Sequence, residues 1–409
     1  MSADRTSATA ARSTRPPEEI LVMLPSAPSG GEGIPLSAPL AGLPLWRRIV
    51  LAAERAGFGR ILVKHPDCEQ PASLAGTAAS PLSPAACGAD DARRVVFLAG
   101  NVVPTTEWLR RIRTMPLPAE HLYIDGASVA VAVARDCREL LRLATAAATM
   151  AELVTALRAL LKTVDGGIDR DGRVVLAGTG DVPAAERWLL RGLIKPNEGL
   201  MSRLLERRIS LAVTRRLCRT SVTPNAVTLV SLGVGLLGAL FFLSSSALFQ
   251  VTGALLFLTH SILDGCDGEL ARLKFLESRR GALLDVVGDN LVHAVVFSSM
   301  AIGWSVAVGA AWPLLIGAVA VASTTGSAVV VYRRGMRAST DADRSSTVAR
   351  LADGLAYRDF IYVIVVLAAL GRAHWFIGVT ALGAPAFLLM LAWLGRRADP
   401  RRSPAALAR

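Results

Sequence analysis

The chain has 409 residues, of which 52% are hydrophobic, and its mean hydropathy is +0.44. This composition is too apolar for an ordinary soluble enzyme, and the length favours two or three domains. The net charge of +12 is compatible with nucleic acid, but only 5% of residues are aromatic and no nucleic-acid-binding motif is present. We therefore expect no nucleic-acid partner and assign the basic excess to an anionic membrane surface. The five cysteines have neither metal-ligand spacing nor an even count, which favours a reducing, cytosolic environment.

The first half of the chain contains no apolar run long enough to span a bilayer. Residues 1–18 are rich in Ser, Thr, Ala and Arg and lack an apolar core, which predicts a disordered tail rather than a secretory signal. Residues 19–194 alternate short apolar runs with amphipathic segments, which predicts an α/β domain with a parallel sheet covered on both faces. The predicted strands are 20–24, 60–64, 94–99, 128–134 and 174–177, and the predicted helices are 45–56, 107–113 and 136–162.

Residues 195–222 form a basic segment between the two halves of the chain. Its arginines are Arg203, Arg207, Arg208, Arg215, Arg216 and Arg219. A solvated helix face is one interpretation. Because the segment directly precedes a membrane span, we favour an amphipathic helix lying on the anionic leaflet.

Six apolar runs follow and predict a transmembrane bundle of six helices over residues 223–398, with a basic tail at 399–409. The runs lie at 226–245, 248–264, 282–304, 308–332, 359–370 and 374–395. A span needs about 20 residues, so the fifth run must extend at its ends or tilt.

Basic residues are concentrated in alternate connections between these runs. They are Arg272, Lys274, Arg279 and Arg280, then Arg333, Arg334, Arg337, Arg344, Arg350 and Arg358, and finally Arg396, Arg397, Arg401 and Arg402. The other connections contain only Arg372. The positive-inside rule then predicts that both termini and the basic loops are cytosolic.

Four aspartates interrupt the apolar sequence at helical spacing. Asp264 and Asp267 end the second run, and Asp285 and Asp289 lie in the first turns of the third. Side chains three or four residues apart share one face of a helix. The predicted topology brings both pairs to the cytosolic edge of the membrane, with a loop of about a dozen residues between them. One pair alone could equally be an ion pair with nearby arginines. Four acids together would repel one another without a cation, and Mg²⁺ prefers carboxylate ligands, so the cluster predicts a metal site.

Small residues and an arginine surround these acids. Gly268 and Gly281 each cost a helix about 1 kcal/mol, so they serve either close helix packing or the approach of a ligand to the backbone. Arg272, one turn after Gly268, can hold a phosphate oxygen. Metal ions, arginine and small residues together favour phosphoryl transfer, with the metals neutralising a pyrophosphate.

The complete pattern resembles the signature of the CDP-alcohol phosphotransferase family. The matching residues, all at the family spacing, are Asp264, Asp267, Gly268, Ala271, Arg272, Gly281, Asp285 and Asp289. The resemblance implies six transmembrane helices and a reaction in which a hydroxyl acceptor displaces CMP from a CDP-linked alcohol.

The resemblance also implies a role for each of these residues. Asp264, Asp267, Asp285 and Asp289 would hold Mg²⁺ or Mn²⁺, with two ions expected, and Asp289 would be the general base for the acceptor hydroxyl. The cytidine diphosphate site would be lined by Gly268, Ala271, Arg272, Gly281 and Asn225, the last in a Thr-Pro-Asn segment whose proline equally marks a helix start. A carboxylate on a metal has a depressed pKa and is a poor base, so Asp289 should be the least tightly coordinated.

The acceptor side carries further basic and titratable residues. Arginines at the cytosolic ends of the fourth and fifth runs either set the topology or form a basic pocket for inositol phosphate or glycerol phosphate. They are Arg333, Arg334, Arg337 and Arg358. His260 and His293 lie four residues from the nearest motif aspartates, and we expect structural roles for both.

Residues 39–63 and 95–101 resemble sugar-nucleotide and inositol-phosphate nucleotidyltransferases, which implies a Rossmann-like α/β fold. Residues 195–210 resemble the linker of bifunctional proteins in which such a domain is fused to a CDP-alcohol phosphotransferase. These fusions make CDP-inositol and then di-inositol phosphate products.

Two departures from the nucleotidyltransferase pattern predict an inactive domain, retained for structure or regulation. The glycine-rich loop 26–33 lacks the basic residue that such loops carry for a triphosphate. Asn101 stands where a metal-binding aspartate is expected, and a neutral amide does not replace a carboxylate on Mg²⁺. Asp125 and Asp165 are alternative ligands, although the glycines beside them favour turns.

The leading interpretation is a multi-pass transferase of the inner membrane in phospholipid or inositol-phosphate synthesis. It would move a phosphoalcohol or phosphatidyl group from a CDP-alcohol to a hydroxyl, with the active site and N-terminal domain cytosolic. The resemblance also implies a homodimer. The alternatives are a membrane transporter, whose acids would line a path through the bilayer, and a non-catalytic membrane scaffold.

Overall fold

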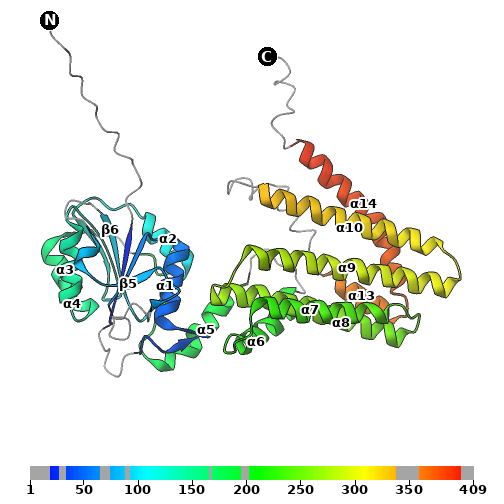
Figure 1. Cartoon of the computed structure of the whole chain (residues 1–409), viewed down its shortest axis with the longest axis horizontal. Coiled ribbons are helices and arrows are strands. Elements are labelled where there is room, and N and C mark those ends of the chain that lie inside the picture. The colour runs from blue at the N-terminus through cyan, green and yellow to red at the C-terminus, as the bar shows by residue number, and fades with distance from the viewer. Residues whose placement is uncertain are drawn as a thin grey trace, which may run out of the picture. The chain divides into compact units, whose positions relative to one another are not determined.

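The computed structural model describes residues 19–26, 34–64, 74–87, 93–164, 168–194, 202–337 and 359–397. The chain divides into two compact units, Met1–Trp188 and Leu189–Arg409 (Figure 1). Several predictions lie outside the described residues: both tails at 1–18 and 399–409, most of the glycine-rich loop 26–33, linker residues 195–201, Asp165 and Arg358.

The first unit is an α/β fold, as the alternation of apolar and amphipathic segments predicted. Its strands are β1 Ile20–Leu24, β2 Pro39–Leu40, β3 Leu43–Pro44, β4 Arg60–Val63, β5 Ala79–Pro81, β6 Arg93–Ala99, β7 Val102–Pro104, β8 His121–Asp125, β9 Val129–Ala134, β10 Lys162–Thr163 and β11 Arg173–Val175. Its helices are α1 Leu45–Ala56, α2 Thr106–Thr114, α3 Cys137–Ala146, α4 Met150–Leu160 and α5 Val182–Arg191, with short 3₁₀ turns at Pro84–Ala86 and Thr179–Asp181.

The main sheet has seven strands in the order β10-β8-β9-β6-β1-β4-β5. Strand β1 pairs in parallel with β4 and β6, but β9 runs antiparallel to both β6 and β8. The prediction of a parallel sheet therefore holds for the pairs that β1 and β4 form and is wrong at β9, which makes the sheet mixed. The reason is local, because β8 and β9 are joined by a tight turn in which Gly126 has φ 56°, and a parallel pair would need a long crossover.

The predicted helix over 136–162 is also wrong, because it breaks into α3 and α4. Thr149 caps α4 by accepting a hydrogen bond from the backbone N–H of Glu152, whose carboxylate accepts from the N–H of Ala148 at 2.8 Å. This reciprocal arrangement starts a new helix.

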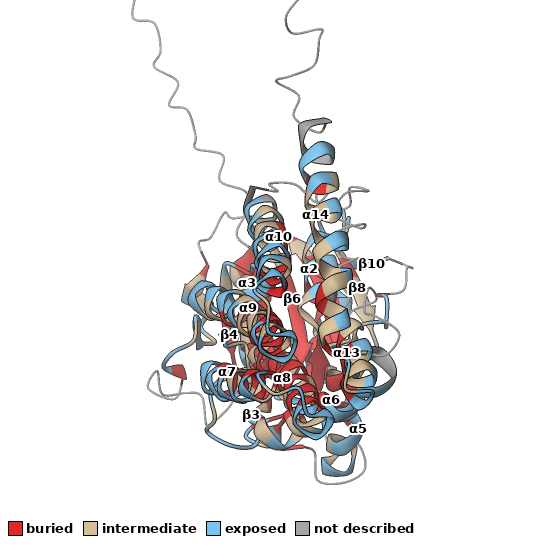
Figure 2. Ribbon diagram, turned by 90° about the vertical axis from the view of Figure 1, so that its right-hand side faces the viewer, coloured by how far each residue is buried: buried red, intermediate tan, exposed pale blue. Residues whose placement is uncertain are grey.

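The core of the first unit lies on both sides of the sheet. All five residues of β1 are buried, as in a central strand covered on both faces, and Figure 2 shows β6 among the buried segments. Trp108 of α2 and Phe97 of β6 are among the largest fully buried side chains. Cys137 is buried at the start of α3, where desolvation and a hydrogen bond with Cys87 raise the pKa of its thiol.

The second unit is helical. After a π-helical turn at Ser202–Glu206, its helices are α6 Arg207–Leu217, α7 Pro224–Phe241, α8 Ala247–Lys274, α9 Arg279–Val308, α10 Trp312–Arg337, α13 Phe360–Ala369 and α14 His374–Arg397. Among the described residues five helices, α7 to α10 and α14, are long and apolar enough to cross a membrane. Helix α13 is apolar but has only 10 residues, which corresponds to about half the thickness of a bilayer core.

Helices α8 and α9 extend well beyond the apolar runs that predicted them. Strong helix formers continue α8 to Lys274, ten residues past the predicted end at Asp264, and Ser278 caps the start of α9 by accepting from the N–H of Gly281 at 3.0 Å. Only residues 275–278 join the two helices, so the loop of about a dozen residues that we expected between the two aspartate pairs was wrong. The short connection holds the two helices antiparallel.

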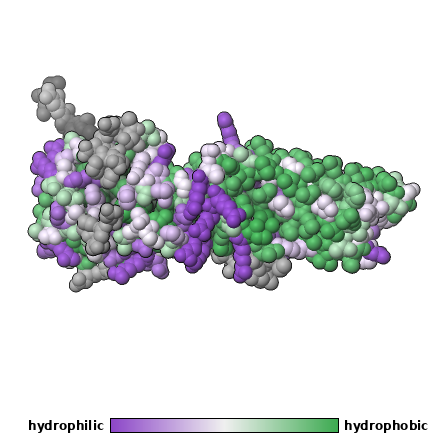
Figure 3. Space-filling model, turned by 90° about the horizontal axis from the view of Figure 1, so that it is seen from below, coloured by the Kyte–Doolittle hydropathy of each residue, from purple (hydrophilic) through white to green (hydrophobic). Residues whose placement is uncertain are grey.

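The surface of the helical unit is apolar over most of its length. Figure 3 shows hydrophobic side chains covering the visible face of this unit, at the right of the view. Exposed residues include Leu240 at 59%, Val306 at 75% and Leu382 at 79%. An apolar surface of this extent suits lipid rather than water, which is consistent with a multi-pass membrane protein.

Glycines set the spacing between the helices. A methyl group at Gly303 of α9 would lie 2.9 Å from the carbonyl oxygen of Leu243 and closer still to that of Phe242. Backbone atoms cannot yield as a flexible side chain can, so this crossing requires glycine. Gly233 of α7, by contrast, has nothing within 4 Å of such a methyl group.

We expect Gly303→Ala to lower the stability of the helical unit by about 1–3 kcal/mol through overpacking. Gly233→Ala is the matched control and should be neutral or stabilising by up to about 1 kcal/mol. The measurement is the Tm of each purified variant in the same detergent. Equal Tm values for the two variants would contradict the close crossing at Gly303.

Candidate functional site

Three of the predicted aspartates converge where α8 and α9 approach each other. Asp264, Asp267 and Asp285 each offer a carboxylate oxygen, and these oxygens all lie within 4.8 Å of one another. Asp264 and Asp267 are 6% and 4% exposed, and Asp285 is half-buried. The helical spacing within α8 aims both of its aspartates to one side, and the short connection to α9 brings Asp285 opposite them.

The donor set fits a hard divalent cation. Mg²⁺ binds oxygen at about 2.1 Å, so ligand oxygens on opposite sides of one ion lie about 4.2 Å apart. The separations within 4.8 Å need only a small adjustment to reach that geometry. Buried carboxylates this close would otherwise have to share protons or repel one another.

Helix α7 contributes a residue that the sequence analysis missed. Thr228, 6% exposed, donates a hydrogen bond from its hydroxyl to Oδ2 of Asp267. The bond restricts the rotamer of this carboxylate. A signal was available, because Thr228 lies one helical turn after Pro224, which begins α7.

Asp289 lies one turn further along α9, next to two histidines. Its Oδ1 is 3.5 Å from Nε2 of His260 and 3.6 Å from Nδ1 of His293. His260 is 2% exposed, and its Nδ1 lies 2.8 Å from the hydroxyl of Ser231 on α7. Asp289 therefore lies beside two ring nitrogens, and it is not one of the three carboxylates whose oxygens lie within 4.8 Å of one another.

Gly268 and Arg272 are neighbours on α8. A methyl group at Gly268 would lie 3.2 Å from Nη1 of Arg272, so the absence of a side chain gives the guanidinium room to lie along the helix. Ala271 is half-buried beside them. The arginine fork is thus held one turn from Asp267, where it can meet a phosphate oxygen.

Gly281 and Asn225 bring the starts of α9 and α7 together. A methyl group at Gly281 would lie 3.1 Å from Oδ1 of Asn225 and 3.0 Å from the hydroxyl of Ser278. Asn225 is exposed in the first turn of α7. Both residues therefore lie at the same end of the bundle as the aspartates.

Of the four arginines predicted to form an acceptor pocket, the structure describes the side chain of one. Arg333 is exposed near the end of α10, while the side chains of Arg334 and Arg337 and all of Arg358 lie outside the described residues.

The first unit contains the second candidate site, around Asn101. The side-chain amide of Asn101 donates to the carbonyl of Leu176 at 2.8 Å, and its own backbone carbonyl accepts from the N–H of Leu176 at 2.9 Å. Its Oδ1 is buried without a hydrogen-bond partner among the described residues. The side chain thus fastens two segments together, a role that a carboxylate cannot fill because it has no N–H to donate.

Asp125 is the alternative metal ligand that the structure describes, and its carboxylate is paired with two arginines. It forms ion pairs with Arg173 and, at 3.2 Å, with Arg170. The side chain of Arg173 is 5% exposed, and burial lowers the pKa of its guanidinium. Arg173 also lies 5.3 Å from the ring centroid of Trp108, so Asp125 balances a buried cation at this position.

The helical unit matches a known protein family. Residues 221–393 match the family model for CDP-alcohol phosphatidyltransferases. The bifunctional IPC transferase and DIPP synthase of Rubrobacter xylanophilus is 34% identical over 146 residues, which cover 35% of this chain and 33% of that protein. The phosphatidylinositol phosphate synthase of Mycobacterium marinum is 28% identical over 216 residues, covering 51% of this chain and 90% of that protein.

Among solved structures, the phosphatidylinositol phosphate synthase of Mycobacterium tuberculosis with CDP-DAG bound is 20% identical, covers 46% of this chain and 94% of that chain, and has a TM-score of 0.34. This chain spans about a third of the length of the bifunctional relatives that it matches. The family resemblance inferred from the motif is confirmed for the segment that carries it: residues 221–393, with the aspartate cluster of α8 and α9, form a domain of the CDP-alcohol phosphatidyltransferase family.

Proposed function

We propose that the helical unit transfers a substituted phosphate group from a CDP-alcohol to a hydroxyl acceptor and releases CMP. The observation that carries this function is the convergence of Asp264, Asp267 and Asp285 within 4.8 Å inside the family domain. Relatives named phosphatidylinositol phosphate synthase support a phosphatidyl donor such as CDP-diacylglycerol and an inositol phosphate acceptor. Relatives named DIPP synthase support CDP-inositol as the alternative donor.

Asp264, Asp267 and Asp285 would hold Mg²⁺ or Mn²⁺, with two ions the proposed number. When bound, the metal supplies positive charge that neutralises the pyrophosphate of the donor. Thr228 orients Asp267 through its hydrogen bond. The guanidinium of Arg272 holds a phosphate oxygen of the donor.

The remaining family positions would line the nucleotide. Gly268, Ala271 and Gly281 leave the backbone accessible to a flat cytidine diphosphate, and Asn225 lies against Gly281 with amide donors and acceptors for a base or ribose.

Asp289 would take the proton of the acceptor hydroxyl. The acceptor oxygen then forms a bond to phosphorus while the bond from phosphorus to the CMP oxygen breaks, and the electron pair leaves with CMP. Its place beside two ring nitrogens, outside the three carboxylates that lie within 4.8 Å of one another, supports this role.

The membrane arrangement is part of the same proposal. We take α13 as a sixth span, because six crossings put both basic ends of residues 223–398 on one face, and that face is the cytosolic side of the inner membrane. Residues 195–222 would form an interfacial helix, and the protein would be a homodimer. A transporter is less well supported, because the acids gather at one end of the bundle rather than along a path through it.

Residues 19–194 would form a nucleotidyltransferase-like domain of Rossmann type without activity. The bond from Asn101 to Leu176 and the ion pairs of Asp125 support this, because both of the candidate ligand positions that the structure describes serve the packing of the unit.

Removal of divalent metal should stop CMP release. We expect EDTA to abolish release from CDP-diacylglycerol with inositol 1-phosphate, and Mg²⁺ or Mn²⁺ to restore it. Asp264→Asn should weaken Mn²⁺ binding at least about tenfold, as measured by electron paramagnetic resonance, because one hard anionic ligand is lost. Asp171→Asn, an exposed carboxylate of the first unit, is the control. Metal-independent CMP release would contradict the mechanism.

The variant Asp289→Asn tests whether Asp289 acts as the general base or as a metal ligand. Turnover should fall by about 10²–10⁴-fold, because the asparagine cannot accept a proton, while the Kd for the CDP-alcohol stays near that of the wild type. Calorimetric titration and CMP release provide the two measurements. Loss of Mn²⁺ and nucleotide binding in this variant would instead identify Asp289 as a metal ligand.

The first unit should form no CDP-inositol from CTP and inositol 1-phosphate. Asn101→Asp should not restore activity and should cost about 1–3 kcal/mol of stability, because a carboxylate oxygen would then face the carbonyl of Leu176. Mass spectrometry of the product and the Tm of the variant are the measurements, with a bifunctional relative as positive control. CDP-inositol made by the wild-type protein would disprove the inactive domain.

A further inference from the structure

Glu269 is a fully buried carboxylate in the signature segment, and the proposed reaction does not use it. It is 0% exposed and lies two residues after Asp267 on α8. Burying a carboxylate is unfavourable unless partners satisfy its oxygens. Glu269 lies in the same turn of α8 as Asp267, so the side chains that bond to Glu269 also hold this turn in place.

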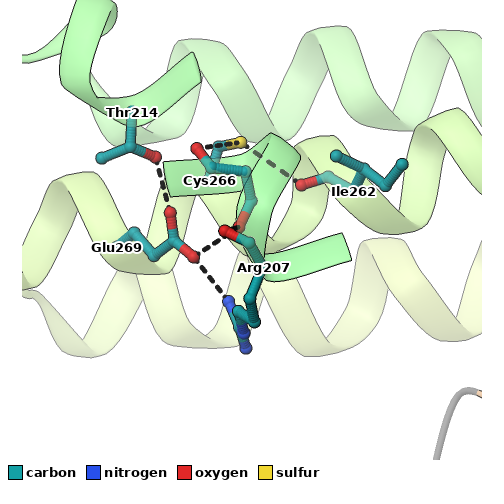
Figure 4. Close-up of polar contacts among 6 residues, drawn as sticks. Arg207, Thr214, Ile262, Cys266 and Glu269 are labelled. Carbon is teal, nitrogen blue, oxygen red and sulfur yellow. Dashed lines mark hydrogen bonds and ion pairs between the residues drawn. The ribbon is translucent and has the colours of Figure 1, made fainter. Parts of the chain in front are cut away.

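Three side chains of α6 bond to Glu269, and Figure 4 shows two of them, Arg207 and Thr214, beside its carboxylate. Arg207 Nη1 lies 2.6 Å from Oε1, and the hydroxyl of Ser210 donates to the same oxygen at 2.7 Å. The hydroxyl of Thr214 donates to Oε2 at 2.7 Å. Ser210 and Thr214 are the buried residues of α6, and the side chain of Arg207 is 18% exposed. Both oxygens are therefore satisfied by one neighbouring helix.

The two faces of this turn of α8 have different neighbours. At about 100° per residue, Asp264 and Asp267 share one face, while Gly265, Cys266 and Glu269 lie on the opposite face. The first face contributes to the aspartate cluster, and the second face meets α6. Within six residues the helix thus carries both the candidate metal ligands and an anchor to another helix.

The anchored face also packs closely. A methyl group at Gly265 would lie 3.2 Å from Nη1 of Arg207, and Sγ of Cys266 donates to the carbonyl of Ser210 at 3.5 Å. Glycine and cysteine allow α6 to approach α8 here, so the arginine and the hydroxyls reach the carboxylate directly. A longer side chain at Gly265 would displace the guanidinium.

We propose that Glu269 is a positioning residue, which locks the turn carrying Asp264 and Asp267 onto α6 through Arg207 and Thr214. This role rests on the metal site of the proposed function, not on the transfer reaction itself. One turn of helix moves nearly as a rigid body, so a rotation of α8 allowed by losing the anchor would displace both aspartate oxygens together. Metal ligands tolerate displacements of only a few tenths of an ångström, so the loss should appear first in metal affinity.

The test uses the purified full-length protein and Mn²⁺ as the probe. Glu269→Ala should raise the Kd for Mn²⁺ by about 10–100-fold, measured by electron paramagnetic resonance without substrate. The KM for Mn²⁺ in CMP release should rise in parallel, while the KM for the CDP-alcohol at saturating Mn²⁺ should change by less than about threefold. Glu269→Gln should rescue most of the Mn²⁺ affinity, because its amide oxygen can accept from Arg207 and Ser210 and its NH₂ can donate to Thr214.

Gln250→Ala is the matched control, because Gln250 is a buried polar residue of the same helix at the opposite end. It is 6% exposed, donates to the carbonyl of Ser244 at 3.4 Å and accepts from the N–H of Ala373 at 3.2 Å. Its Kd for Mn²⁺ should stay within about twofold of the wild type even where its Tm falls.

Three results would overturn the positioning role. They are a Glu269→Ala protein with a lower Tm but an unchanged Kd for Mn²⁺, an equal loss of affinity in Gln250→Ala, and no rescue by Glu269→Gln. Where Glu269→Ala fails to fold, Thr214→Val removes one bond at constant shape and should still raise the Kd about threefold. Wild-type protein that binds Mn²⁺ but releases no CMP would disprove the proposed reaction and leave the positioning role standing, whereas a lack of Mn²⁺ binding by the wild type would overturn both.

Discussion

Repulsion among three carboxylates at one end of an apolar bundle is the constraint around which the helical unit is arranged. Two unit charges 4.8 Å apart repel by about 3.5 kcal/mol at an effective dielectric constant of about 20. Three such pairs amount to about 10 kcal/mol, which is comparable to the whole stability of a typical domain. Such a cluster persists only with compensation. The hydrogen bond from Thr228 to Asp267 supplies part of it, and a divalent cation would supply the larger part.

Close packing turns this charge cluster into a defined geometry. Lipid provides no hydrophobic force between helices, so their positions depend on short-range contacts, such as the approach of Gly303 to the backbone at Phe242. Directed polar bonds add to these contacts at the functional end, where Glu269 joins α8 to α6 and Ser231 joins α7 to His260. Breaking a buried ion pair by removing one partner costs about 3–5 kcal/mol, so the pair of Arg207 and Glu269 is expected to be retained while the bundle is folded.

In the first unit, asparagine and aspartate side chains stabilise the fold and do not gather into a cluster of candidate metal ligands among the described residues. Asn101 and Asp125 occupy positions where catalytic carboxylates were sought, yet their side chains bond to Leu176 and to two arginines of the unit itself. A side chain committed to satisfying a buried partner is not free to bind a metal. These bonds stabilise the fold of the first unit, and our proposal that the unit is retained for structure or regulation rests on them.

The sequence alone determined the family of residues 221–393, the α/β and helical halves, and the residues of the aspartate motif, because motif spacing and hydrophobic periodicity are local properties of the chain. It misjudged the sheet direction at β9, the break between α3 and α4, and the length of the connection between α8 and α9, where turn geometry and capping override periodicity. Only the tertiary structure decided that Glu269 is anchored by α6, that Thr228 orients Asp267, and that His260 borders Asp289. These contacts join residues far apart in the chain, and their partners are chosen by how helices pack, which no local pattern encodes.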